Sequence, residues 1–136
     1  MRRLCWISAA AIGLVLATTS EPRAQTREKT KLTLRAAPEV GTSSTVFVFQ
    51  ARLTGAKESE EFYCLISEWF WEEQADSSLN EFECPPYIPG QTKIERVFTE
   101  EQSFRRPGPH RVRLVLRKGE KEIASASVIV TVRPSR

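Results

Sequence analysis

The stretch that decides the fold is FRRPGPHRVRLVL, residues 104–116. Its Pro107-Gly108-Pro109 segment indicates a turn. Apolar and basic side chains alternate after the turn: His110, Val112, Leu114 and Leu116 share one parity, and Arg111, Arg113, Val115 and Arg117 share the other. Because successive side chains of a strand point to opposite faces, the pattern predicts a half-buried strand with an apolar inner face and a basic outer face.

Five other segments alternate in a similar way, with turn residues between them. We expect strands at residues 31–35, 45–54, 62–71, 92–99 and 123–132. Turns are expected at residues 39–44, 55–61 and 118–120, and residues 72–90 form a long excursion without a clear period. Strands that recur about every ten residues, separated by turn signals, are typical of an all-β sandwich.

The parity of each strand selects a core. The inner faces are expected to carry Leu32, Leu34, Phe47, Phe49, Ala51, Leu53, Trp69, Trp71, His110, Val112 and Leu114. We interpret His110 as a core residue that donates a hydrogen bond to a backbone carbonyl, since no nucleophile has a recognisable spacing from it. Phe70 has the opposite parity to the tryptophans and is expected to point outward, either under the excursion or exposed as a contact residue together with Tyr87.

Residues 1–24 have the pattern of a signal peptide. Arg2 and Arg3 precede the apolar run LCWISAAAIGLVLA, and small residues follow it. Cleavage is expected after Ala17 or after Ala24. The run is short for a membrane span, so we predict no stable span after cleavage, although an uncleaved anchor is the alternative. The prediction is a single domain at residues 25–136 that is exported, either periplasmic or secreted.

Charge gives no reason to expect a nucleic-acid partner. The full chain has a formal net charge of +3 from 20 basic and 17 acidic residues. Cleavage after Ala17 removes two arginines and leaves 18 basic residues against 17 acidic ones, a net charge of +1. Because affinity for nucleic acid comes largely from basic residues that neutralise phosphates, a nearly neutral mature chain gives no case for such a partner.

Two cysteines, Cys64 and Cys84, remain after export. An even number in an oxidising compartment predicts a disulfide, which would close a loop of about 20 residues and contribute roughly 3 kcal/mol. Two cysteines and a single histidine cannot complete a four-ligand zinc site without carboxylates. The spacing is also far from that of a redox C-x-x-C pair.

Four stretches together resemble a polycystic-kidney-disease (PKD) domain: TVFVF at 45–49, EWFW at 68–71, residues 104–116, and VIVTV at 128–132. The resemblance covers roughly residues 32–132, with His110 standing where the family usually has tyrosine. It implies an immunoglobulin-like β-sandwich of about seven antiparallel strands. It also implies a module for adhesion, spacing, or protein or carbohydrate contacts rather than a catalyst.

No catalytic constellation is present in the sequence. It lacks G-x-S-x-G, H-E-x-x-H and a glycine-rich phosphate loop. Glu68, Glu72 and Glu73 are close enough in sequence to pair as carboxylates, but we interpret them as a solvated strand end. The acidic residues between 57 and 83 lack a D-x-D-x-D spacing, so we interpret them as a soluble edge rather than a calcium site. We therefore predict no enzyme activity, no metal and no cofactor.

Two surfaces are candidates for binding. One is the basic face, where Arg111, Arg113 and Arg117 form a row that would meet an anionic partner. The other is the excursion, with Phe70 and Tyr87 as contact residues. The leading hypothesis is an exported, non-enzymatic binding or structural module that contacts a protein or a glycan. The alternative is a secreted inhibitor or an accessory subunit of an extracytoplasmic enzyme, which presents Pro85-Pro86-Tyr87 as a rigid loop.

Overall fold

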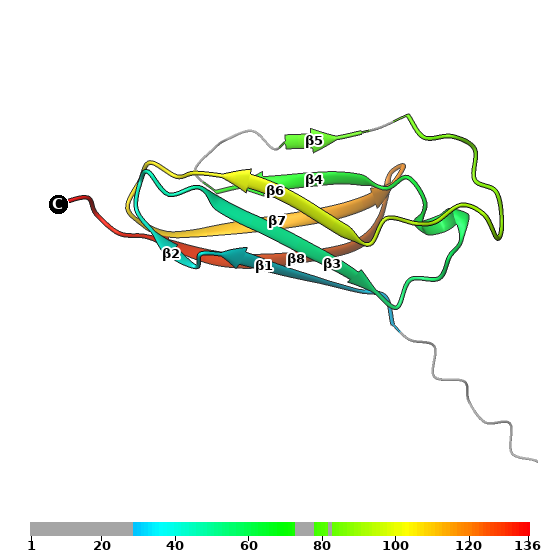
Figure 1. Ribbon diagram of the computed structural model, residues 1–136, viewed down its shortest axis with the longest axis horizontal. Helices are drawn as coiled ribbons and strands as arrows, with labels where there is room; N and C mark the ends of the chain where they lie inside the picture. The colour runs from blue at the N-terminus through cyan, green and yellow to red at the C-terminus, as the bar shows by residue number, and fades with distance from the viewer. Residues whose placement is uncertain (1–28, 73–77, 82) are drawn as a thin grey trace, which may run out of the picture.

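The alternating segments form eight strands and one short helix in the computed structural model, which describes residues 29–72, 78–81 and 83–136 (Figure 1). The predicted signal peptide lies outside these residues. In chain order the elements are β1 (Lys31–Ala37), β2 (Val40–Gly41), β3 (Phe47–Thr54), the 3-10 helix η1 (Glu60–Phe62), β4 (Ile66–Trp71), β5 (Ser78–Asn80), β6 (Val97–Gln102), β7 (Gly108–Lys118) and β8 (Lys121–Val132).

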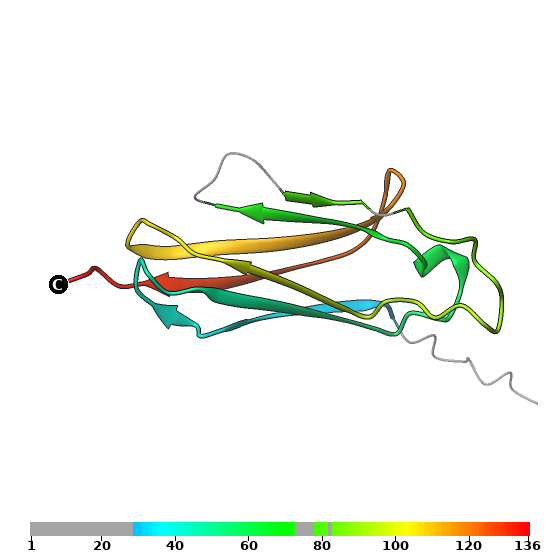
Figure 2. The same ribbon diagram turned by 45° about the horizontal axis from the view of Figure 1, so that its top comes forward.

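The strands form two sheets that lie face to face (Figure 2). One sheet has three strands in the order β1-β3-β6, and the other has five in the order β2-β8-β7-β4-β5. All the neighbouring strands run antiparallel except β2, which pairs in parallel with β8. The predicted fold class, an all-β sandwich, is confirmed.

The core between the sheets is aromatic. Phe47, Phe49, Ala51 and Leu53 from β3 are buried, as are Val112, Leu114 and Leu116 from β7. Trp69 and Trp71 stack at 5.6 Å between ring centroids, and the ring of Phe49 lies 5.4 Å from that of Trp71. The inward parity of these strands therefore places their largest side chains in one layer, where burial contributes most to stability.

Two predicted strands begin later than expected. The segment predicted at 62–71 forms β4 only from Ile66, because η1 and the left-handed backbone of Cys64 (φ 56°) precede it. The segment predicted at 92–99 becomes the strand β6 only at Val97 and then continues to Gln102. The backbone N–H of Ile94 donates instead to the Glu58 carboxylate, which removes it from strand pairing.

The segment predicted as a turn at 39–44 also contains a strand, β2. Two hydrogen bonds hold it against β8: Thr131 N–H donates to the carbonyl of Glu39, just before β2, at 2.9 Å. The N–H of Arg133, just after β8, donates to the carbonyl of Gly41 at 2.7 Å. The long excursion contains the three-residue strand β5, which pairs with Ser67–Trp69 of β4. The five-stranded sheet therefore includes two short strands, β2 and β5, that the sequence did not predict.

Candidate binding surfaces

A disulfide between Cys64 and Cys84 attaches the excursion to the segment before β4, with the two Cα atoms 6.1 Å apart. From Cys84 the chain runs along the end of the sandwich to Thr92, and we name residues 84–92 the disulfide loop (Figure 1). Pro85, Pro86 and Pro89 in this loop are exposed. The bond is the one predicted from the cysteine count.

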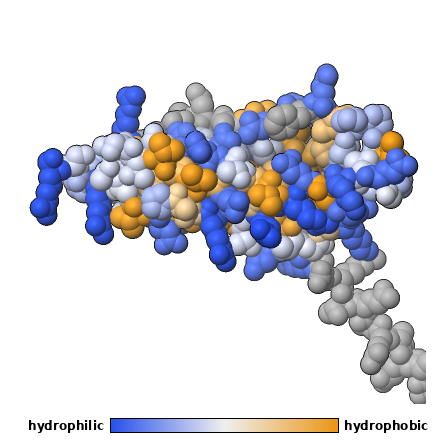
Figure 3. Space-filling model, in the orientation of Figure 1, coloured by the Kyte–Doolittle hydropathy of each residue, from blue (hydrophilic) through white to orange (hydrophobic). Residues whose placement is uncertain are grey.

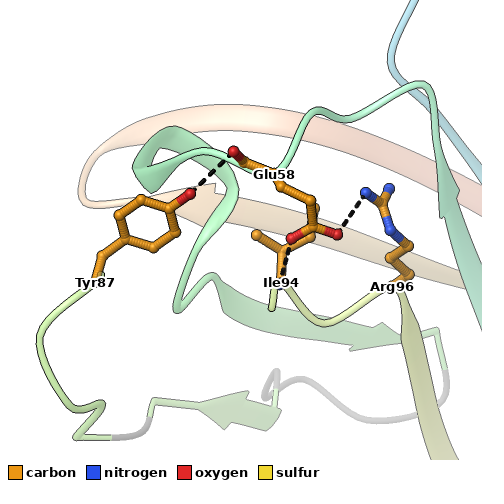
Figure 4. A network of polar contacts seen from close by, with 4 residues as sticks. All are labelled: Glu58, Tyr87, Ile94 and Arg96. Carbon is orange, nitrogen blue, oxygen red and sulfur yellow. Dashed lines mark hydrogen bonds and ion pairs between the residues drawn. The ribbon is translucent and has the colours of Figure 1, made fainter. Parts of the chain in front are cut away.

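Two tyrosines hold the disulfide loop against the body of the protein. The hydroxyl of Tyr63 donates to the Pro85 carbonyl at 2.7 Å, and its ring lies 5.5 Å from that of Tyr87. The hydroxyl of Tyr87 donates to the Glu58 carbonyl at 2.9 Å (Figure 4). Tyr87 therefore uses its polar end within the protein. Tyr87 and Phe70 are both half-buried, and Phe70 lies under Arg113, so their role as contact residues stays a prediction.

Glu58 fastens the return of the loop as well. Its carboxylate accepts hydrogen bonds from the backbone N–H of Ile94 at 2.9 Å and from the guanidinium of Arg96 at 3.0 Å (Figure 4). These donors, Ile94 first and then Arg96, hold the pKa of Glu58 below its ordinary value because they favour the charged form. Glu58 thus joins its own segment both to the disulfide loop and to the residues that follow the loop.

The far end of the loop is a closed turn with an apolar side chain on its surface. Ile88 N–H donates to the Thr92 hydroxyl at 2.8 Å, and Thr92 N–H donates to the Ile88 carbonyl at 2.9 Å. Gly90 adopts φ 78°, which suits glycine. The Ile88 side chain is 50% exposed. In the space-filling view an apolar group lies among charged side chains at this end of the molecule (Figure 3).

The three predicted arginines of β7 do not form one uniform row. Arg117 is half-buried in an ion pair with Glu68 at 3.1 Å, so it stabilises the sheet. The guanidinium of Arg113 lies 5.3 Å from the centre of the Phe70 ring, a cation–π contact. Val115, which has the same parity, is fully buried and separates Arg113 from Arg117. Of the three arginines, only Arg111 and Arg113 are exposed.

Arg111 lines a shallow depression of about 250 Å³ together with Glu72, Pro109 and Ile129. The Glu72 carboxylate accepts a hydrogen bond from the backbone N–H of Arg111. Ile129 of β8 is 52% exposed beside Arg111. Ile129 is not among the predicted site residues, although the alternation of 123–132 gives it the outward parity.

His110 is buried at the connection between β6 and β7. Its Nε2 donates to the Arg106 carbonyl at 2.7 Å, and its ring stacks on Phe104 at 4.6 Å.

The candidate carboxylates do not assemble as a site in the described residues. Glu68 and Glu72 bond to β7, as described above, and Glu73 lies outside the described residues. No group of three or more potential metal-ligating side chains occurs in the described part of the chain. The helices of that part include none with the length and apolarity that a membrane crossing requires.

Among solved structures, the chain is similar to the CARDB domain of a Pyrococcus furiosus protein, which was crystallised in complex with di-metal ions. The TM-score is 0.51 at 12% identity, over 79% of this chain and 97% of that one. The fold is immunoglobulin-like. Two further features are usual in such sandwiches: Trp69 is buried on β4, and a side chain at the start of β7 bonds back to the preceding corner.

Two other structures are similar over much of the chain. A Pseudomonas fluorescens alkylpurine DNA glycosylase bound to DNA matches at a TM-score of 0.50 and 13% identity, over 77% of this chain but only 30% of the glycosylase. Human titin ZIg10 matches at a TM-score of 0.33 and 14% identity, over 95% and 93% of the two chains. No family model and no curated protein matches. The likenesses at TM-scores of 0.51 and 0.50 establish the fold alone, so membership of the PKD family stays a prediction.

Proposed function

We propose that this chain is an exported, non-enzymatic module that binds a protein partner through the disulfide loop. One observation carries the proposal: the loop is fastened at several points while its far end stays exposed and apolar. The disulfide, the Tyr63 and Tyr87 hydroxyls and the Glu58 carboxylate all hold it. Ile88 is 50% exposed at the far end.

Rigidity of this kind favours binding. A flexible loop loses conformational entropy when it is bound, whereas a loop already held in one conformation loses less. An exposed aliphatic side chain on such a loop can fill an apolar pocket of a partner, and interface hot spots lie in well-packed, desolvated pockets. Ile88 and the exposed prolines form a surface of this type. We favour a protein over a glycan because Ile88 and three prolines make up most of the exposed side chains of the loop.

Export is part of the proposal. Residues 1–24 carry the pattern of a cleaved leader, and a disulfide is stable in an oxidising compartment. An inhibitor or an accessory subunit of an extracytoplasmic enzyme would use the same loop. To test such a role, Ile88 is the residue to change, because it is the exposed apolar residue of the loop. Tyr87 instead holds the loop in place through its hydrogen bond to Glu58.

The proposal can be tested by photo-cross-linking in the organism that encodes the protein. A photoreactive amino acid replaces Ile88 in one variant and Val46 in another. Val46 is a matched control because it is 54% exposed, against 50% for Ile88. We expect a discrete adduct of one additional protein from position 88 and none from position 46. We also expect purified Ile88→Asp to compete with that adduct at least about tenfold less well than the wild type.

The competing outcomes are distinct. Equal adducts from positions 46 and 88, or undiminished competition by Ile88→Asp, would remove the disulfide loop as the binding surface. Tyr87→Phe provides a second check, because it loses the bond to the Glu58 carbonyl but leaves Ile88 unchanged. We expect this variant to compete a few-fold less well, since its loop is held less firmly.

A further inference from the structure

The outer face of the five-stranded sheet has a repeated pairing across two of its strands. In the register of β4 and β7, Phe70 lies opposite Arg113 and Trp71 lies opposite Val112. Continuing this register by one residue places Glu72 opposite Arg111. Each row therefore holds a cation on the β7 side and a group that attracts a cation on the β4 side, either a carboxylate or an aromatic ring. The pattern is complementary to itself.

We propose that a second copy of this chain docks on this face, around a two-fold axis that runs between β4 and β7. Such an axis places Arg111 of one copy opposite Glu72 of the other, and Arg113 opposite Phe70. Every contact then occurs twice, as an isologous interface requires. An axis through β7 itself would oppose like charges, so the charges select the position of the axis.

The side chains at this face are available for such contacts. The ion pairs among the described residues involve Glu58, Glu61 and Glu68, and neither the Glu72 carboxylate nor the Arg111 guanidinium takes part in them. The depression is lined by Arg111 and Glu72 together with Pro109 and Ile129. It can accept the guanidinium of the second copy, because stacked sheets lie about 10 Å apart and arginine side chains span that gap.

The size of the face indicates a weak dimer. Strand β7 has 11 residues, but β4 has 6 and β5 has 3, so the flat part of the face is small. Stable dimers bury about 800 Å² on each partner, and smaller interfaces are transient. We therefore expect association that depends on concentration and weakens at high salt, where exposed ion pairs are screened. The disulfide loop remains exposed in this dimer, so the inference is independent of the proposed function.

Sedimentation velocity of the exported, disulfide-bonded chain tests the inference, over a few-hundredfold range of concentration. We expect the average mass of the wild type to rise toward that of a dimer. Glu72→Arg and Arg111→Glu are each expected to weaken association at least tenfold, because like charges then oppose each other. An equimolar mixture of the two variants should dimerise again, since each copy supplies the charge that the other lacks. Arg52→Glu, an exposed change on β3 of the other sheet, should dimerise like the wild type.

Two results would overturn the inference. One is a wild type that stays monomeric at every concentration. The other is a mixture of Glu72→Arg and Arg111→Glu that associates no better than either variant alone. Because Glu72 also accepts the N–H of Arg111 within one copy, Glu72→Arg can disturb the fold. Glu72→Gln keeps an oxygen for that N–H and removes the charge, and it should still weaken association in the folded protein.

Discussion

At the scale of single residues, His110 stabilises the corner between β6 and β7. Immunoglobulin-like sandwiches often have a tyrosine here whose hydroxyl bonds to the backbone upstream. In this chain the Nε2 of His110 donates to the Arg106 carbonyl, and the ring stacks on the fully buried Phe104. The imidazole of His110 therefore replaces the tyrosine hydroxyl as the hydrogen-bond donor to this corner.

We expect His110→Ala to destabilise the protein by about 2–3 kcal/mol, because it removes a buried hydrogen bond and a ring contact. His110→Tyr should lose less than half as much, since a phenol hydroxyl donates to the same corner. Urea unfolding followed by the fluorescence of Trp69 and Trp71 measures both. A loss below about 0.5 kcal/mol for the alanine variant would show that the corner contributes little.

Glu58 gives a prediction about pH. Its pKa is lowered by the N–H of Ile94 and the guanidinium of Arg96, so the charged carboxylate is favoured in the folded protein. A lowered carboxyl pKa contributes stability above the unfolded value, near pH 4, and that contribution is lost as pH falls through the folded value. We expect Glu58→Gln to be less stable than the wild type at neutral pH and the difference to shrink in acid.

Urea unfolding of both proteins at neutral pH and at about pH 3 measures this difference. Glu95→Gln is a suitable control, because Glu95 is exposed and close in sequence. Its difference from the wild type should be small at both pH values. An equal loss for Glu58→Gln at both pH values would mean that the charge of Glu58 does not hold the loop.

At the scale of elements, alternation predicted the strands that have one clearly buried face. Strands β3, β7 and β8 follow the expected parity because a shift of one residue would expose every core side chain. The starts of β4 and β6 could not be predicted, since they depend on contacts between distant segments, such as Glu58 with Ile94. Strand β2 has two residues, too few for any period.

The candidate surfaces were predictable to a similar degree. The sequence identified the disulfide loop and the basic strand, because cysteine count and alternation are local signals. It did not reveal that Arg117 pairs with Glu68, since that contact depends on the register of β4 with β7. Nor did it separate Tyr87, which holds the loop, from its exposed neighbour Ile88, because a carbonyl 29 residues away makes the difference.

At the scale of the whole molecule, the sandwich and the loop are stabilised by different means. The two sheets bury an aromatic layer, and β1 lies beside β8 to close one side of it. The disulfide loop contributes no residue to the large, fully buried side chains of the described core. It is held by one covalent bond and a few hydrogen bonds. Loss of the covalent bond should therefore affect the loop more than the sheets.

We expect the double variant Cys64→Ser/Cys84→Ser to fold into the same sandwich and to lose about 3 kcal/mol, because the cross-link restricts the unfolded chain over a separation of 20 residues. Limited proteolysis should then cut within the disulfide loop well before it cuts β3 or β7, since local opening of the loop costs less than global unfolding. Urea unfolding and mass analysis of the fragments measure the two effects.

Wild type kept in reductant is the matched control and should behave like the variant. If cleavage instead began in the sheets, or if the variant were as stable as the oxidised wild type, the loop would owe its conformation to the tyrosines and Glu58 alone. In that case its rigidity, on which binding through Ile88 depends, would not require an oxidising compartment.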